Sequence, residues 1–101
     1  MTSRTPESEL KEKIKDFLDA RGAFWSMVTG GVYSKPGDPD MVVCYKGRYV
    51  AIEAKAPNGV QRPEQKTRQK QIEKANGIYI LAYSVRDVER ELNSIDSGLY
   101  G

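Results

Sequence analysis

Apolar residues recur at helical spacing near the start of the chain. Thr5 and Pro6 are typical of a helix start, because threonine caps the free N–H groups of a first turn and proline is favoured at its first position. The apolar positions that follow, three or four residues apart, are Leu10, Ile14, Phe17 and Leu18. Gly22 ends this pattern. We therefore expect one amphipathic helix before Gly22.

Short apolar runs then replace the helical spacing. The run AFWSMV at 23–28 predicts a strand, and a glycine-rich loop over 29–39 follows it. Two further strands are predicted near 40–45 and 48–55, joined at Lys46-Gly47, and the run IYILAY at 78–83 predicts a buried strand. The larger side chains of these runs that we expect in the core include Phe24, Trp25, Cys44 and Tyr49.

Two more helices complete the predicted elements. Pro63 opens a polar, basic helix that continues to about residue 75, where an Asn-Gly pair closes it. Ser84 and Asp87 match a capping box for a last helix through Leu92. The resulting order α-β-β-β-α-β-α predicts an α/β fold, a mixed β-sheet flanked by helices.

The length of 101 residues fits one folding unit. We expect a single domain over 1–101, with an ordered core of about 5–93 and a loose tail at 94–101. The chain shows no charged-then-apolar leader, and its longest wholly apolar run, at 78–83, is far too short to span a membrane. These features favour a cytoplasmic protein.

Composition excludes several kinds of chemistry. Cys44 is the single cysteine and there is no histidine, so neither an intramolecular disulfide nor a Cys/His zinc site can form. A histidine-based nucleophile pair and an imidazole general base are excluded as well. The 16 Lys+Arg and 14 Asp+Glu give a net charge of +2, too small by itself to identify a nucleic-acid partner. Any catalysis must therefore use carboxylates, lysines or a metal ion.

The predicted hairpin places two carboxylates opposite each other. With a two-residue loop at Lys46-Gly47, Asp40 faces Glu53, and a four-residue loop keeps this register whereas a three-residue loop shifts it. Directly opposed like charges destabilise a sheet. Because side chains alternate along a strand, Lys55 shares the face of Glu53. Three ionisable groups thus meet at one end of the hairpin.

A divalent cation would relieve the repulsion between these carboxylates. Mg²⁺ and Mn²⁺ take oxygen ligands and retain bound waters, so two carboxylates, a carbonyl and a substrate phosphate form a suitable shell. Such an ion lowers the pKa of a bound water, and the ammonium of Lys55 could orient that water or meet charge growing on the phosphate. This combination indicates hydrolysis of phosphodiester bonds.

The same residues carry a resemblance to a known family. The pair PD at 39–40, followed by EAK at 53–55, resembles the motif of the PD-(D/E)xK nuclease superfamily. Together with GDPD at 37–40 and PEQ opening a helix at 63–65, it is similar to the virus-type replication-repair nuclease (VRR-NUC) family. The resemblance covers nearly the whole chain, as in a standalone module, and implies a restriction-endonuclease-like fold.

The resemblance implies a role for each matching residue. Asp40 and Glu53 would be metal ligands together with the backbone carbonyl of Ala54, and Lys55 would be the catalytic lysine. The ion would be Mg²⁺ or Mn²⁺. Gln65, on the helix that follows, would help to arrange the site.

The family also has an acidic residue on its first helix. Glu7 is our choice, because it lies one turn before Leu10 on the face turned toward the sheet, while Glu9 points aside. The choice between Glu7 and Glu9 stays open at this stage. An alternative role for Glu7 is that of a first-turn acid favoured by the helix dipole.

The resemblance implies a metal-dependent DNA endonuclease acting in DNA replication, repair or recombination. Standalone modules of the family resemble Holliday-junction resolvases, so we expect a homodimer acting on branched DNA. The alternatives are a flap-specific or nicking nuclease that acts as a monomer, and a non-catalytic DNA-binding module. The basic residues just after the site that are candidates for phosphate contacts are Arg62, Lys66, Arg68 and Lys70.

Overall fold

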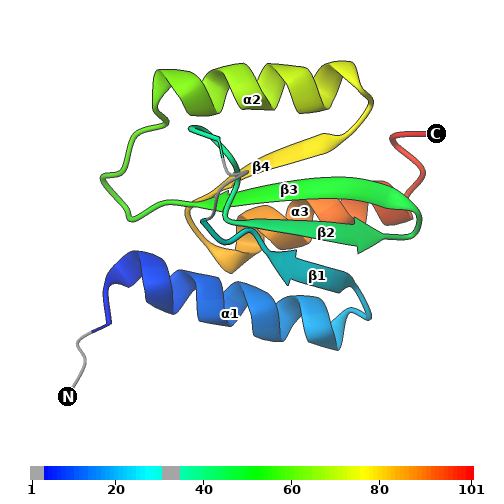
Figure 1. The fold of residues 1–101 in the computed structure, drawn as a ribbon. Helices are drawn as coiled ribbons and strands as arrows, with labels where there is room; N and C mark the ends of the chain where they lie inside the picture. Colours follow the sequence, from blue (N-terminus) through cyan, green and yellow to red (C-terminus); the bar gives the residue numbers. More distant parts are fainter. Residues whose placement is uncertain (1–3, 31–34) are drawn as a thin grey trace.

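A four-stranded mixed sheet lies between helices on its two faces in the computed structural model, which describes residues 4–30 and 35–101 (Figure 1). The elements follow in the order α1 (Pro6–Ala20), β1 (Phe24–Met27), β2 (Met41–Tyr45), β3 (Arg48–Ala54), α2 (Pro63–Lys74), β4 (Ile78–Ala82) and α3 (Val85–Asp96). This confirms the predicted order and fold class. Part of the predicted loop at 29–39 lies outside the described residues. No helix in the described part of the chain is long and apolar enough to cross a membrane.

The strands lie in the order β1-β2-β3-β4. Each of the first two pairings is antiparallel, while β3 and β4 are parallel, which requires the crossover connection that α2 supplies. Helices α1 and α3 pack against each other on one face of the sheet, and α2 covers the other face over β4 (Figure 1).

The hairpin of β2 and β3 has the predicted register. Met41 pairs with Ile52 and Cys44 pairs with Tyr49, so Asp40 and Glu53 come next in line where the strand pairing ends. The two loop residues, Lys46 and Gly47, have φ angles of 51° and 80°. Positive φ at both loop positions is the mark of a tight two-residue hairpin loop whose twist matches that of the strands.

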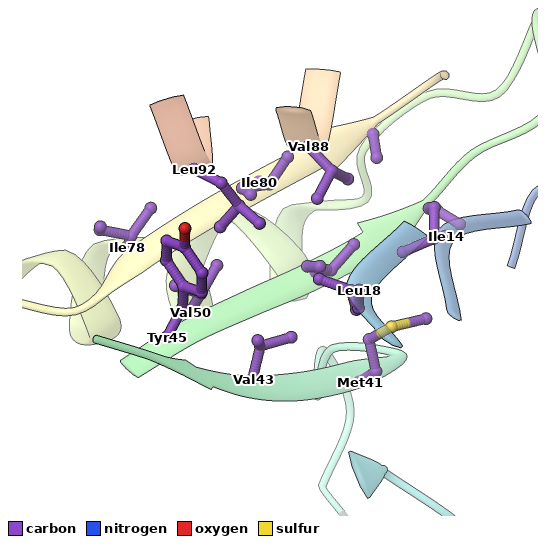
Figure 2. Packing of buried hydrophobic residues seen from close by; sticks show 13 residues of the cluster. Ile14, Leu18, Met41, Val43, Tyr45, Val50, Ile78, Ile80, Val88 and Leu92 are labelled. Atoms are coloured by element: carbon purple, nitrogen blue, oxygen red, sulfur yellow. The ribbon is translucent and has the colours of Figure 1, made fainter. Parts of the chain in front are cut away.

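Alternate residues of β2, β3 and β4 build the core with one apolar stripe of α1 and one of α3. Ile14 and Leu18 of α1 and Val88 and Leu92 of α3 are fully buried. Figure 2 shows Val88 and Leu92 pointing toward β4, while Ile14 and Leu18 lie near Met41 at the start of β2. The core therefore fixes α1 over the end of the hairpin where Asp40 and Glu53 lie.

The last helix continues beyond its predicted end at Leu92. Asp96, expected in a loose tail, is the final residue of α3, and its carboxylate binds three groups. Tyr45 Oη donates to Asp96 Oδ1 at 2.8 Å, Lys46 Nζ lies 2.6 Å from the same oxygen, and an Arg21 guanidinium nitrogen lies 2.7 Å from Oδ2. These contacts hold the end of α3 against the hairpin loop and the end of α1.

Three of the four residues named for the core lie elsewhere. Phe24 is 74% exposed, Tyr49 is 49% exposed and Cys44 is exposed, whereas Trp25 packs against the core as predicted. The strand pattern was correct, but among the described residues α2 packs over β4 and no helix covers the part of this sheet face formed by β1 and β2. Apolar side chains over β1 and β2 on that face therefore meet solvent.

Candidate active site

Three carboxylates from three elements converge at the open end of the hairpin. Glu7 lies in the first turn of α1, Asp40 directly precedes β2 and Glu53 lies near the end of β3. One oxygen of each lies within 4.8 Å of an oxygen of the others. The structure thus brings Glu7 to the pair predicted from the hairpin, while Glu9 is exposed and lies outside this cluster.

Backbone hydrogen bonds to two neighbouring segments hold Asp40. Its carbonyl accepts from Val28 N–H at 2.9 Å, and its own N–H donates to the carbonyl of Ile52 at 3.0 Å. Its side-chain Oδ2 accepts from Ala54 N–H at 2.8 Å. The carboxylate therefore acts as a substitute backbone acceptor where the pairing of β2 and β3 ends, which fixes its position near Glu53.

Glu53 is a buried carboxylate with an unsatisfied oxygen. The residue is 5% exposed, and among the described residues no donor pairs with its Oε1. Burial, followed by repulsion from the Asp40 charge, raises the pKa of Glu53 to about 7, while Lys55 acts in the opposite direction. A buried acceptor without a partner is costly, so this position favours a proton or a cation.

Two ammonium groups flank the carboxylates. Lys55 Nζ lies 4.0 Å from Glu53 Oε2, and its side chain is only 11% exposed. Lys11 Nζ lies 3.5 Å from Asp40 Oδ1 and 3.9 Å from Glu7 Oε1. Sequence reasoning missed Lys11. Its spacing of four residues from Glu7, which puts both on one side of a helix, was the signal available.

Gln65 and Ala54 lie in the interior. Gln65 is 1% exposed in the first turn of α2, and its Oε1 accepts from Arg62 N–H at 2.9 Å. This bond completes a capping arrangement at the start of the helix. Ala54 is fully buried at the end of β3, where its N–H is held by Asp40.

The four basic residues predicted to contact DNA have different surroundings. Lys66 and Lys70 are exposed, and Arg62 is exposed with its Nε 3.7 Å from Glu64. Arg68 is half-buried, and its Nε lies 3.3 Å from Asp38 Oδ1. The structure therefore does not present the four as one free basic face, because Arg68 ties the loop before β2 to α2.

Gly37 makes the same loop fit against α2. Its φ is +89°, and a Cβ at this position would lie 2.2 Å from the carbonyl oxygen of Glu64. Only glycine allows the loop to approach the first turn of α2 so closely. The GDPD motif thus contributes twice: its glycine lets the loop pack on α2, and its last residue, Asp40, belongs to the acidic cluster.

Tyr79 is a second residue that sequence reasoning did not connect with the site. It pairs with Ala51, so it lies on the same sheet face as Glu53, and it is 7% exposed. Its hydroxyl is buried without a hydrogen-bond partner among the described residues. Burial raises the pKa of Tyr79, the nearby Gln61 side chain acts in the opposite direction, and the charges of Glu53 and Asp40 add to the rise. No sequence motif marks this tyrosine.

The donor set fits a hard divalent cation. All three converging side chains offer carboxylate oxygens, the ligands that Mg²⁺ and Mn²⁺ prefer. The unpartnered Oε1 of Glu53 is an orphaned buried acceptor at the same place. The residues present therefore supply suitable oxygen ligands, and a bound ion would give the unpaired Glu53 oxygen a partner.

A solved structure named "VRR_NUC domain" is similar to this chain. The TM-score is 0.76, and the match covers 89% of this chain and 97% of that chain, with 20% sequence identity. No family model matches the chain, and no curated protein matches it in sequence. The likeness confirms that the chain has the fold of a VRR_NUC domain, the fold that the resemblance in sequence led us to expect.

Proposed function

We propose that this protein is a metal-dependent DNA endonuclease of the VRR-NUC type. The observation that carries the proposal is the convergence of Glu7, Asp40 and Glu53 on a VRR_NUC fold, with a buried Glu53 oxygen left unpaired. A structural role for the three acids would not explain why like charges gather where one of them lacks a partner.

Asp40 and Glu53, with the backbone carbonyl of Ala54, are the proposed ligands, and Glu7 is the acid that completes the cluster. The proposed ion is Mg²⁺ or Mn²⁺, which when bound lowers the pKa of a bound water and stabilises charge developing on a phosphate. The two carboxylate ligands approach from the two strands of one hairpin, so the β2–β3 register determines their spacing.

The remaining residues position the reacting groups. The ammonium of Lys55, held near Glu53, orients the attacking water or meets the growing charge on the phosphate. Gln65 caps α2 and so holds its first turn in place. The loop before β2 packs on this first turn, so Gln65 supports that loop beside the site. These roles need no histidine, in keeping with the composition.

We further propose that the substrate is branched DNA and that the protein acts as a homodimer in replication, repair or recombination. Lys66 and Lys70 are exposed cations that suit phosphate contacts, and Arg62 is a third. A symmetric dimer would offer two sites for two strands. Sedimentation tests the dimer, because a species of only 11 kDa that cleaves a four-way junction fully would reject it.

Cleavage assays test the proposed activity. Labelled four-way junction, flap, single-stranded and linear duplex DNA would be incubated with Mg²⁺, Mn²⁺ or EDTA. We expect cleavage that needs a metal and that Lys55→Ala abolishes. If wild-type protein binds DNA but cuts no substrate with either metal, the non-catalytic binding module replaces the nuclease proposal.

A further inference from the structure

A groove with a cavity volume of about 510 Å³ opens beside Lys55. Its walls come from the first half of α1, the connection between β3 and α2, and the start of α3, which meet at one end of the sheet (Figure 1). Lys55 lines this groove and its Nζ also lies 4.0 Å from Glu53 Oε2, so the groove adjoins the carboxylate cluster through this lysine.

Two free cations line the groove with Lys55. Lys13 comes from α1 and Arg86 from the first turn of α3, and both are exposed. Within residues 4–30 and 35–101, neither forms an ion pair. Glu9 is the one acid in the lining. Arg62, just before α2, and Arg68 within it have acidic neighbours, so Lys13 and Arg86 are less compensated than these two arginines.

Tyr83 forms an aromatic wall of the same groove. The residue is 42% exposed, although its hydroxyl donates to the carbonyl of Gly59 at 3.0 Å and its backbone N–H donates to Asp87 Oδ2 at 2.8 Å. The ring is therefore held at both ends while part of it stays open to the groove. An exposed aromatic ring in a groove that cations also line is a typical stacking surface for nucleic-acid bases.

The tether on Tyr83 also reaches the predicted catalytic lysine. A Cβ on Gly59 would lie 3.3 Å from both Cβ and Cδ of Lys55, so the loop that Tyr83 holds packs directly on the Lys55 side chain. A ligand that settles on the Tyr83 ring would therefore adjoin Lys55, the group proposed to face the scissile phosphate.

We propose that this groove binds the unpaired DNA strand that adjoins the cleaved bond, with one base stacked on Tyr83 and its phosphates on Lys13 and Arg86. This inference rests on the proposed nuclease function. The groove falls in the range of about 300–1,000 Å³ that accommodates one small molecule. A base inside a duplex has both faces covered by its neighbours, so only an unstacked base can use the Tyr83 ring. The preferred substrate class is accordingly DNA with a single-stranded segment next to the cut.

Binding measured in EDTA tests the groove independently of cleavage. The probe is a duplex with a single-stranded flap, compared with the same duplex without the flap, by fluorescence anisotropy across a salt series. Lys13→Gln with Arg86→Gln should weaken flap binding about tenfold or more and lower the salt slope by roughly 1.4, at about 0.7 for each lost single-strand phosphate contact. The control is Lys74→Gln with Arg90→Gln, which removes the same two charge types from exposed positions that do not line the groove; Arg90 differs from Arg86 in that its Nη1 lies 3.7 Å from Asp87 Oδ1.

Tyr83 is tested by a pair of variants. Tyr83→Phe removes the tether to Gly59 and keeps the ring, whereas Tyr83→Leu removes both. A 2-aminopurine base in the flap should report quenching with wild type and Tyr83→Phe and lose it with Tyr83→Leu. Quenching that survives in Tyr83→Leu would overturn the stacking contact.

The outcomes separate this inference from the nuclease proposal. Flap binding that depends on Lys13, Arg86 and Tyr83 in a protein that cuts nothing would keep the groove and reject the nuclease. If wild-type protein cleaves DNA with a metal and the groove variants bind and cut like the control pair, the nuclease proposal stands and the groove proposal is rejected. Equal losses on flap and blunt duplex would also overturn the groove as a single-strand site.

Discussion

The Oδ2 atom of Asp40 lies 2.8 Å from the backbone nitrogen of Ala54 and accepts its hydrogen bond. One carboxylate thus belongs both to the acidic cluster and to the hydrogen bonding that ends the hairpin. Substitutions that treat these two functions differently can separate them.

Asp40→Asn keeps a side-chain oxygen for the Ala54 N–H and removes one negative charge, whereas Asp40→Ala removes both. In EDTA we expect Asp40→Asn to be as stable as wild type or more so, because the repulsion with Glu53 is relieved. Asp40→Ala should lose about 1–3 kcal/mol, since it leaves a buried N–H unpaired. Thermal and urea melts measure this difference, and equal stabilities for the two variants would contradict the proposed dual role.

The same two variants should both lose cleavage and respond weakly to metal. A ligand that binds only the folded state raises the melting temperature according to its concentration relative to its dissociation constant. We therefore expect the rise produced by Mg²⁺ or Mn²⁺ to be smaller in Asp40→Asn than in wild type. Retained cleavage in Asp40→Asn, with an unchanged metal-induced rise, would sink this account of the site.

We expect the metal-free protein to become less stable as pH rises, because of the raised pKa of Glu53. The pKa of Glu53 is raised from 4.5 to about 7, so between these values the folded state keeps a proton that the unfolded state loses. Stability contributed by this group is complete below the unfolded pKa and falls through this window, with a total cost on the order of 3 kcal/mol above it. Glu53→Gln should flatten this dependence and be the more stable protein near neutral pH. Melts in EDTA across the window measure the difference, and parallel pH profiles would contradict it.

Lys11 supplies positive charge to the carboxylate cluster from within the chain. Its ammonium lies near both Asp40 and Glu7, so Lys11→Met should lower stability in EDTA and increase the stabilisation that added metal gives. Lys15→Met is the matched control, because Lys15 pairs with Glu12 on the same helix, outside the cluster. Metal titrations followed by melting temperature compare the two, and equal responses would remove Lys11 from the electrostatics of the site.

Asp96 should stabilise the fold through its three partners. Hydrogen bonds from Lys46, then Tyr45, and then Arg21 lower the pKa of Asp96 to about 2. The contribution is therefore present above the ordinary aspartate pKa and is lost as pH falls through about 2. Asp96→Asn should lower the melting temperature near neutral pH more than Asp16→Asn, an exposed position on α1. Equal melting temperatures would show that the end of α3 contributes little.

The sequence alone predicted which elements form, their order and, given a two-residue loop, the hairpin register. These features depend on local physics: a cap at Thr5, a two-residue loop at Lys46-Gly47, and alternation of side chains along each strand. Because the register follows from the loop, the nearness of Asp40 and Glu53 could be predicted before any tertiary contact was known.

Only the tertiary structure decided which other groups join that pair and which faces are covered. The choice between Glu7 and Glu9, and the arrival of Lys11, depend on the rotation of α1 over the sheet, which Ile14 and Leu18 set by packing in the core. The exposure of Phe24 and Cys44 follows from where α2 crosses the second face, and no local pattern encodes that crossing. The groove beside Lys55 is likewise made by three segments far apart in the chain, so its cations carry no motif in the sequence.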